Sequence, residues 1–379
     1  MDRSPRLARS GPDNKPLDVL VIGGGQGGLV MGFHLAKRGQ RFTIVDAGAD
    51  VGQTWRLRWD SLKLFTAAQY DNLPGMEFPA PHDSYPGKDD VADFLQAYAT
   101  KFELPVALNT RVTSLRHTEL YEIETDQGQI QAHNVVVATG PFQVPFIPPM
   151  AKDIDADVFQ IHSIDYRRPD TIPSGRVLVV GAANTGCQIA LELSATHDVE
   201  ISAGQHLPTI PQRPLGHDIW WWATRVGLTR ITFGSRLGKK LSTRDQVIGG
   251  GERELKRNGV VVRPRLTEVE RRSVGFADGT SSEYETVLWA TGFRTDHSWI
   301  DIQQVKDEQG HIQHERGVTV APGLYVLGLS WQHTRTSALL GWVTNDAEYL
   351  AEHIVFKGNL DWISGRRRGL TTPRIEGAR

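Results

Sequence analysis

Cysteine is almost absent from this sequence, and its scarcity excludes several kinds of chemistry. Cys187 is the only cysteine among the 379 residues. One cysteine cannot form an intrachain disulfide, a cysteine-based zinc cluster or a C-x-x-C redox pair, so we expect no metal site and no disulfide reductase that works through two thiols. Such cysteine usage is typical of a reducing compartment, and we expect a cytoplasmic protein.

The sequence also lacks a dominant charge and long apolar runs. Its 42 Lys and Arg residues nearly balance 44 Asp and Glu residues, for a net charge of −2, which argues against a nucleic-acid partner bound through a basic surface. Because no run of about eighteen apolar residues occurs, we expect no membrane span. Residues 1–16 are basic but have no apolar segment of a secretory signal, and we expect them and residues 364–379 to be flexible tails. These patterns leave the oligomeric state open.

Glycine, in contrast, is abundant, with 38 residues, and a glycine-rich turn near the N-terminus is the strongest motif. An apolar strand pattern over 19–22 leads into G-x-G-x-x-G at 23–28, then into a helical pattern, and a second strand over 42–45 ends at Asp46. In a dinucleotide-binding unit the first glycine permits the tight turn, the second lets a pyrophosphate approach the backbone, and the third lets the helix pack on the strand. The acid accepts hydrogen bonds from ribose hydroxyls.

The same order of patterns occurs again in the second half of the chain. A strand over 176–180 leads into the glycine-containing turn 181–186 and a helix, and each half closes with a strand that ends in Ala-Thr-Gly, at 138–140 and at 290–292. A repeated supersecondary unit indicates repeated architecture. We therefore predict an α/β fold with two Rossmann-like dinucleotide-binding domains in the three-layer arrangement of glutathione reductase.

These patterns also suggest where the domains begin and end. Residues 17–148 and 290–358 would form the first, discontinuous domain, because a strand over 324–327 and a helix over 338–354 are expected to return to it. Residues 172–289 would form the second domain. The four prolines between the two halves, in residues 141–149, indicate an irregular linker.

Only the second unit carries a long insertion, at about residues 205–258. It contains Trp220-Trp221-Trp222 within a helical pattern. Two interpretations stay open at this stage. The insertion can be a lid or helical cap whose rings serve packing, or it can form an aromatic wall of a substrate pocket at a domain interface, where ligand sites are frequent.

Several segments together resemble one enzyme family. After the first turn and its acidic strand end comes Gly52-Gln53-Thr54-Trp55-Arg56, and later come His162–Arg167, Trp289–Arg294 and Gly328–Arg335. With the two glycine turns, the chain from about 17 to 355 resembles the class B flavin monooxygenases, the group that includes microsomal-type flavin monooxygenases, Baeyer–Villiger enzymes and the plant auxin-forming enzymes. It is most similar to a bacterial branch of that family.

The resemblance implies FAD on the first unit and NADPH on the second. The residues implied for FAD are Gly23, Gly25, Gln26, Gly27, Gly28, Asp46, Trp55, Arg56, Leu64, Thr66, Val112, Thr139, Gly140 and Gln332. Those implied for NADPH are Gly181, Asn184, Thr185, Gly186, His206, Arg213, Thr291 and Gly292.

The sequence departs from the family pattern in three places. The family signature F-x-G-x-x-x-H-x-x-x-(F/W) is half present, because His162 and Tyr166 match while Ala156 and Val158 replace Phe and Gly. A Baeyer–Villiger assignment is weakened because Tyr166 is not Trp. His162 is a candidate for positioning the nicotinamide or a structural histidine of the linker. The family's Thr-Asn pair is Thr66-Ala67 here, which removes an amide, although the auxin-forming branch lacks it too. In the second turn, Ala183 replaces the middle glycine.

The nicotinamide preference follows from the end of the second unit's second strand. An NAD site places an acid there, whereas this strand ends in Ser-Ala-Gly-Gln-His at 202–206. Without an acid, a 2′-phosphate would not be repelled. We expect NADPH rather than NADH, with His206 or Arg213 contacting the phosphate in place of the usual arginine.

The resulting functional hypothesis is an FAD-dependent monooxygenase that consumes NADPH. It would insert one atom of molecular oxygen into a small organic substrate through a flavin C4a-(hydro)peroxide. One alternative is an NAD(P)H-dependent flavin oxidase or reductase that releases hydrogen peroxide, and another is a nucleotide-binding regulatory flavoprotein without turnover. The sequence leaves open whether sulfur, nitrogen or carbon is oxygenated, since one fold supports many reactions.

Overall fold

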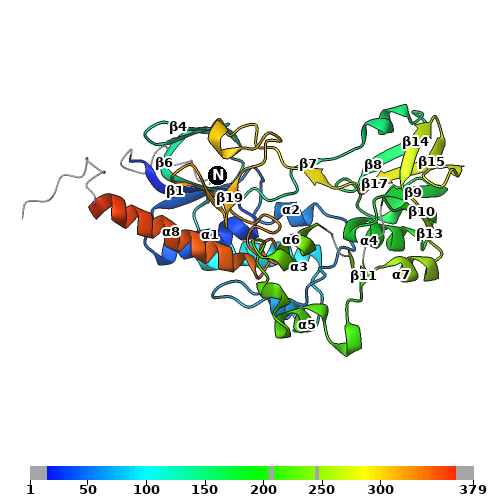
Figure 1. Ribbon diagram of the computed structural model, residues 1–379, viewed down its shortest axis with the longest axis horizontal. Coiled ribbons are helices and arrows are strands. Elements are labelled where there is room, and N and C mark those ends of the chain that lie inside the picture. Colours follow the sequence, from blue (N-terminus) through cyan, green and yellow to red (C-terminus); the bar gives the residue numbers. More distant parts are fainter. Residues whose placement is uncertain (1–14, 205–208, 244–246, 364–379) are drawn as a thin grey trace, which may run out of the picture.

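The computed structural model describes residues 15–204, 209–243 and 247–363, and most of its strands lie in two separate sheets (Figure 1). The first sheet has the order β19-β20-β21-β6-β1-β2-β3, and β4 and β5 extend β6 as an antiparallel meander. Its strands are β1 (Leu17–Ile22), β2 (Phe42–Val45), β3 (Val106–Ala107), β4 (Val112–His117), β5 (Tyr121–Thr125), β6 (Gly128–Val137), β19 (His314–Glu315), β20 (Val318–Thr319) and β21 (Leu324–Val326).

Both faces of the first sheet are covered, which explains its continuous apolar strands. Val19 and Val21 of β1 face α1 (Gln26–Lys37), α3 (Lys88–Lys101) and α8 (Val343–Ile363), whereas Leu20 and Ile22 face β4 and β5. In Figure 1, α8 runs alongside α1. The last helix begins at Val343, later than the expected start, because the segment before it is packed tightly: a Cβ on Gly341 would lie 2.0 Å from the carbonyl oxygen of Tyr70.

The second sheet repeats the plan of the first with five parallel strands. Its order is β13-β10-β9-β17-β8. A small antiparallel sheet, β14-β15-β16, packs on one face, and α4 lies on the other. The elements are β8 (Phe159–His162), β9 (Arg176–Val180), α4 (Asn184–Leu193), β10 (Asp198–Ser202), α7 (Glu252–Arg257), β13 (Val261–Arg263), β14 (Leu266–Glu270), β15 (Ser273–Phe276), β16 (Ser281–Glu283) and β17 (Thr286–Trp289).

The two sheets differ in where their outermost parallel strand comes from. In the first, β21 follows the whole second unit in sequence and pairs with β6. In the second, β8 precedes the unit and pairs with β17. The described chain is thus an α/β fold with two Rossmann-like units, and the predicted fold class is confirmed.

The chain crosses between the two sheets twice, and the two crossings are joined. Residues 141–149 were expected to be irregular, but β7 (Val144–Pro145) pairs antiparallel with β18 (Phe293–Arg294) of the returning segment. Figure 1 shows β7 between the two lobes. A strand forms here despite the prolines because the edge pairing needs few N–H groups from this segment.

The insertion of the second unit packs onto the first unit. Its elements are β11 (Thr209–Ile210), α5 (Ile219–Arg225), α6 (Arg236–Ser242) and β12 (Val247–Ile248). Trp220 in α5 is buried against an aromatic group of the first unit that includes Phe65, Tyr70 and Trp342. Its indole Nε1 donates to the carbonyl oxygen of Phe65 at 3.1 Å. The first tryptophan therefore serves packing between the units.

The other short elements are α2 (Gln53–Arg56) and 3₁₀ turns at Ala68–Tyr70, Pro149–Asp153, Pro169–Thr171, Pro214–Gly216, Leu228–Arg230 and Gln303–Val305.

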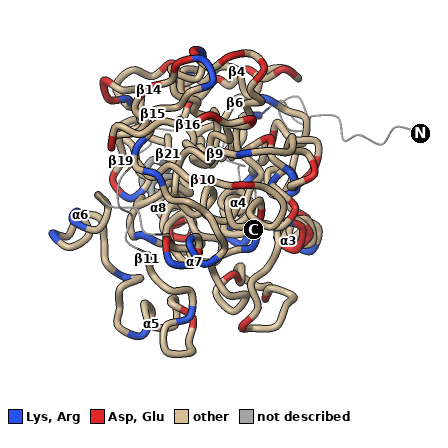
Figure 2. Tube along the Cα trace, turned by 90° about the vertical axis from the view of Figure 1, so that its right-hand side faces the viewer, with Lys and Arg blue, Asp and Glu red and all other residues tan. Residues whose placement is uncertain are grey.

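Acidic and basic residues are interspersed along the chain (Figure 2). No helix in the described ranges has both the length and the apolar character needed to cross a membrane. No His, Cys, Asp and Glu side chains of the same ranges gather as a group that could hold a metal ion.

Candidate active site

The first glycine-rich turn has the geometry of a phosphate cradle. Gly23 has a φ of +110°, and a Cβ there would lie 2.5 Å from the carbonyl oxygen of Ala138. A Cβ on Gly28 would lie 1.8 Å from the carbonyl oxygen of Gly23, so helix and strand meet too closely for any side chain. A Cβ on Gly25, in contrast, would meet no atom within 4 Å. The turn therefore leaves open space at the N-terminus of α1, where backbone N–H groups favour an anion.

Asp46 is held beside this turn at the end of β2. Its Oδ2 accepts a hydrogen bond from the backbone N–H of Gly24 at 2.5 Å, and its Oδ1 accepts one from Gly48 at 2.7 Å. Each carboxylate oxygen has a second lone pair. The acid and the glycine turn, predicted as one site, are in contact.

The second turn has nearly the same backbone. Gly181 has a φ of +108°, and a Cβ on Gly186 would lie 1.8 Å from the carbonyl oxygen of Gly181. Ala183 caps α4 at φ −76° and ψ −177°, close to the −75° and −172° of Gly25 before α1. The two turns differ at this position by one exposed methyl group. Asn184 also ties the turn to the insertion, because its Oδ1 accepts from the N–H of Ile248 at 2.9 Å.

The structure brings several other predicted FAD residues to the first turn. The indole Nε1 of Trp55 donates to Gln26 Oε1 at 3.4 Å. A Cβ on Gly23 would lie 3.2 Å from the N atom of Thr139, so the end of β6 borders the turn. The Gln143 amide holds that strand end, donating to Thr139 Oγ1 at 2.9 Å and to the carbonyl oxygen of Gly140 at 2.8 Å.

The remaining predicted FAD residues contact other residues of the protein. Arg56 forms an ion pair with Asp93 at 2.6 Å. Leu64 is half-buried against the first core, and Val112 begins β4. Gln332 is buried, with its Oε1 accepting from the N–H of Leu329 at 3.3 Å, and its Nε2 has no hydrogen-bond partner within the described part of the chain.

Thr66 leads to a residue that the sequence analysis missed. Its hydroxyl donates to Asp71 Oδ1 at 2.7 Å, and Asp71 is completely buried. The other oxygen, Oδ2, has no hydrogen-bond partner among the described residues. Burial raises the pKa of Asp71 to about 7. No sequence signal marks Asp71, because an aspartate after a short turn is usually exposed.

His162 is fully hydrogen-bonded within the protein. The backbone N–H of Ile164 donates to its Nδ1 at 3.1 Å, so that Nε2 carries the proton and donates to the carbonyl oxygen of Gly292 at 3.1 Å. Burial lowers its pKa and favours this neutral form. The side chain is 3% exposed and joins the end of β8 to the returning linker. This geometry fits the structural interpretation of His162 better than a catalytic one.

Of the two predicted phosphate contacts of the second unit, only Arg213 lies in the described part of the chain. His206 lies outside the described residues. Arg213 donates to Tyr85 Oη at 3.1 Å and to the carbonyl oxygen of Asp83, both in the first unit. No contact in the described ranges joins it to the end of β10. Thr185 lies in the first turn of α4, and Thr291 donates its hydroxyl to the carbonyl oxygen of Phe146 in the other linker.

Instead, Arg265 lies at the end of β10. Its Nε donates to the carbonyl oxygen of Gly204 at 3.2 Å. Ser202 holds the flanking residues, because its hydroxyl donates to the carbonyl oxygen of Pro264 at 2.9 Å and accepts from the N–H of Leu266 at 3.0 Å. Sequence spacing could not reveal this arginine, because only the pairing of β10 with β13 brings it to Gly204.

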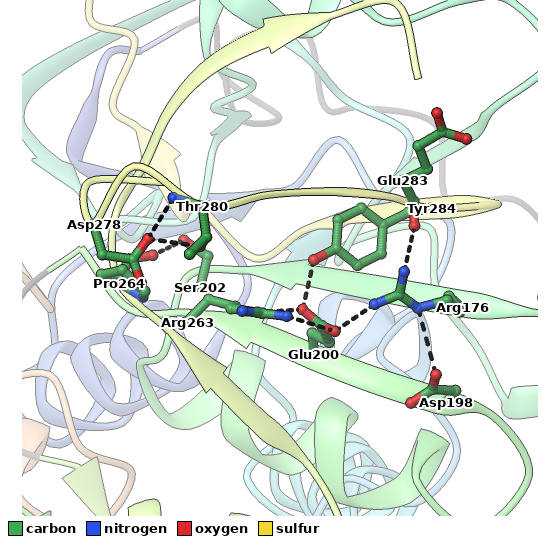
Figure 3. Close-up of polar contacts among 10 residues, drawn as sticks. All are labelled: Arg176, Asp198, Glu200, Ser202, Arg263, Pro264, Asp278, Thr280, Glu283 and Tyr284. Atoms are coloured by element: carbon green, nitrogen blue, oxygen red, sulfur yellow. Dashed lines mark hydrogen bonds and ion pairs between the residues drawn. The ribbon is translucent and has the colours of Figure 1, made fainter. Parts of the chain in front are cut away.

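A buried charge cluster fixes β13 against β10 just before Arg265 (Figure 3). Glu200 is 3% exposed, and its carboxylate accepts from Arg263 and Arg176 at 2.6 Å each and from Tyr284 Oη at 2.6 Å. These partners outweigh burial and hold the pKa of Glu200 below its usual value. A buried carboxylate with three charge-assisted or hydroxyl donors is well compensated. The cluster thereby sets the position of the Arg265 segment.

Comparisons with known proteins give the class of the chain. The sequence signature of the pyridine nucleotide-disulphide oxidoreductases matches residues 20–210. An uncharacterized CzcO-like oxidoreductase of Geobacillus kaustophilus is 43% identical over 342 residues, covering 89% of this chain and 98% of the relative. The chain therefore belongs to the pyridine nucleotide-disulphide oxidoreductase family.

Two further relatives are named monooxygenases. A flavin-containing monooxygenase from Stenotrophomonas maltophilia superposes with a TM-score of 0.76 at 27% identity, over 90% of this chain and 99% of that one. An indole-3-pyruvate monooxygenase of Oryza sativa subsp. japonica is 25% identical, covering 90% of this chain and 94% of the relative. The chain is an oxidoreductase of the flavin-dependent monooxygenase kind, as its sequence predicted, and the non-enzymatic alternative is not supported.

Proposed function

We propose that this protein oxygenates a small organic molecule with FAD and NADPH, the cofactors of its enzyme class. The observation that carries the proposal is the pair of matched glycine turns, at 23–28 and 181–186, which follow the carboxyl ends of the parallel strands β1 and β9. Ligands of open α/β sheets bind at such ends. Bound FAD would supply the redox chemistry of the site, namely hydride acceptance from NADPH and oxygen activation, with one oxygen atom entering the substrate and the other leaving as water.

The residues present fit the two nucleotides. The open space at Gly25 and the N-terminus of α1 would receive the FAD pyrophosphate, and Asp46 would accept from ribose hydroxyls. The turn at Gly181 would receive the NADPH pyrophosphate, somewhat farther from the backbone because of the methyl group of Ala183. Fixed N–H groups at both turns bind anions without needing to reorganise.

Water exclusion would be the second contribution of the chain. Trp220 of the insertion packs with Phe65 and Trp342 of the first unit, with ring centroids 6.3 and 5.4 Å apart. Tyr70 stacks on Trp342 at 5.5 Å. An apolar wall of this kind limits water near a reactive site, which protects oxygen transfer against loss of oxygen as hydrogen peroxide.

Preference for NADPH over NADH is assigned to Arg265. No acid lies at residues 202–204, and the exposed Arg265 guanidinium is held beside Gly204. A guanidinium binds phosphate with charge-assisted hydrogen bonds. Arg265→Gln is expected to reduce the ratio of kcat/KM for NADPH to that for NADH, with NADH turnover unchanged. An unchanged ratio would refute the assignment to Arg265 and leave His206 as the candidate.

The main experiment measures oxygen transfer itself. A panel of organic sulfides, amines and carbonyl compounds is screened for stimulated NADPH oxidation, and labelled oxygen gas is followed into the product by mass spectrometry. We expect one labelled atom per product molecule, with NADPH consumed in equal amount. If NADPH oxidation yields only hydrogen peroxide across the panel, the oxidase alternative replaces the monooxygenase.

A further inference from the structure

Arg58 is a half-buried cation that lacks an anionic partner among the residues that the structure describes. Its guanidinium carbon lies 5.5 Å from the ring centroid of Phe142 and 5.5 Å from that of Phe293, within cation–π distance. Ring contacts of this kind use the faces of the guanidinium, whereas its N–H groups lie in its plane. Within residues 15–204, 209–243 and 247–363, no acceptor lies at hydrogen-bond distance from those N–H groups and no carboxylate forms an ion pair with them.

The charges around Arg58 are not compensated either. Arg167 is the charged group that acts on it, and burial followed by this like charge lowers the pKa of Arg58. Arg167 itself donates to the carbonyl oxygens of Ile164 and Tyr166 at 2.7 and 3.0 Å. Neighbouring His162 is held neutral by its two hydrogen bonds. Arg58 and Arg167 therefore bring two positive charges close together, since an arginine remains protonated in proteins.

This uncompensated charge lies where the two units meet. Phe142 follows the Thr-Gly end of β6, and Phe293 follows the Thr-Gly end of β17. The two linkers are joined there, because the N–H of Phe146 donates to the carbonyl oxygen of Gly292 at 2.9 Å. The Phe142 side chain is 60% exposed. Arg58 itself is only partly buried, so the junction is open to solvent.

The segment that carries Arg58 also borders the second nucleotide turn. Trp59, the next residue, is 5% exposed and lies in the second unit's core with Cys187 of α4. Trp55 and Ala182 pack against the same core. The N–H of Asp60 donates to the carbonyl oxygen of Arg167 at 2.8 Å. Arg58 therefore belongs to the first unit in sequence, but its segment packs against the second unit.

We propose that Arg58 is an anion-binding residue of the junction, which receives a phosphate of the nicotinamide dinucleotide or the carboxylate of an acidic organic substrate. The inference rests on the proposed function for its ligands. Phosphate and carboxylate share the chemistry that a guanidinium recognises, two oxygens that accept parallel hydrogen bonds. The rings of Phe142 and Phe293 would hold the guanidinium plane in place, so that little side-chain freedom is lost when the anion binds.

The test measures equilibrium binding to the purified holoprotein by calorimetry. Wild type, Arg58→Gln and Arg58→Lys are titrated with NADP+ and, in a second arm, with indole-3-pyruvate after saturation with NADP+. Arg168→Gln is the matched control, because Arg168 is exposed and pairs with Asp170 at 2.7 Å. Losing a hydrogen-bonded charge pair is expected to weaken binding by about tenfold or more in Arg58→Gln. Arg58→Lys, which keeps the charge without the planar fork, should fall between the two.

The two arms identify the source of the anion. Weaker NADP+ binding in Arg58→Gln assigns the phosphate, and weaker indole-3-pyruvate binding with unchanged NADP+ binding assigns the carboxylate. If Arg58→Gln binds both probes as wild type does, or if it loses its bound flavin, the inference is wrong. These outcomes do not depend on oxygen transfer, so the proposed function can fail in turnover experiments while the role of Arg58 is still decided.

Discussion

A single methyl group at position 25 is expected to separate ligand binding from folding. Gly25 has φ −75° and ψ −172°, a conformation open to any residue, and a Cβ there would meet no protein atom within 4 Å. Gly→Ala at a compatible position stabilises a protein by about 0.4–1 kcal/mol, because the unfolded chain loses freedom. Gly25→Ala should therefore leave the apoprotein slightly more stable.

The same methyl group should weaken FAD binding, because it occupies the space proposed for the pyrophosphate. Forcing one methyl group into a packed contact costs about 1–3 kcal/mol, which corresponds to an increase of about 5- to 150-fold in Kd. The assay titrates apoprotein with FAD by flavin fluorescence and compares apoprotein unfolding in parallel. Gly25→Ala should thus make the apoprotein more stable against unfolding and lower its affinity for FAD.

Two variants serve as controls. In the second turn, Ala183→Gly removes the corresponding methyl group, so NADP+ should bind more tightly while FAD binding stays unchanged. Gly28→Ala places a Cβ 1.8 Å from the carbonyl oxygen of Gly23, and this variant should fail to fold. If Gly25→Ala folds and keeps the wild-type Kd for FAD, no pyrophosphate lies at this turn and the reasoning is refuted.

Three further predictions concern side chains. Asp46→Ala removes the acceptor for the N–H groups of Gly24 and Gly48 and for ribose, and FAD titration should show binding weaker by about 1–3 kcal/mol. Cys187→Ala should leave anaerobic flavin reduction by NADPH unchanged, because the thiol is buried and its pKa is raised to about 11. A loss of flavin reduction in folded Cys187→Ala would contradict the conclusion that a single cysteine takes no part in the redox chemistry. The carboxyl of Asp71 has a pKa of about 7 in the folded protein against 3.8 in the unfolded chain. Between these two values the folded state keeps a proton that the unfolded state releases. The free energy of unfolding should therefore fall as pH rises from about 4 to about 7, by roughly 4 kcal/mol at most. Asp71→Asn should remove this slope in denaturant unfolding series, and parallel curves for variant and wild type would show that the carboxyl ionises freely.

The sequence by itself determined the two nucleotide-binding units. The strands expected at 42–45 and 176–180 have the same bounds in β2 and β9. The turn at 23–28 and Asp46 were also found together. These features depend on spacing within about 25 residues, where apolar alternation, glycine φ angles and strand length act locally.

The tertiary structure decided how the two units meet. Arg265 reaches Gly204 only through pairing of β10 with β13, and Arg58 reaches the rings of Phe142 and Phe293 only because the two linkers pair. Asp71 is completely buried, and the segment that leads into α8, from the other end of the chain, packs against its neighbours Tyr70 and Asn72. Each of these contacts joins segments far apart in sequence, and a local pattern carries no information about which distant segment will cover a given charge. The contacts of Arg58 and Arg265, and the burial of Asp71, therefore followed from packing alone.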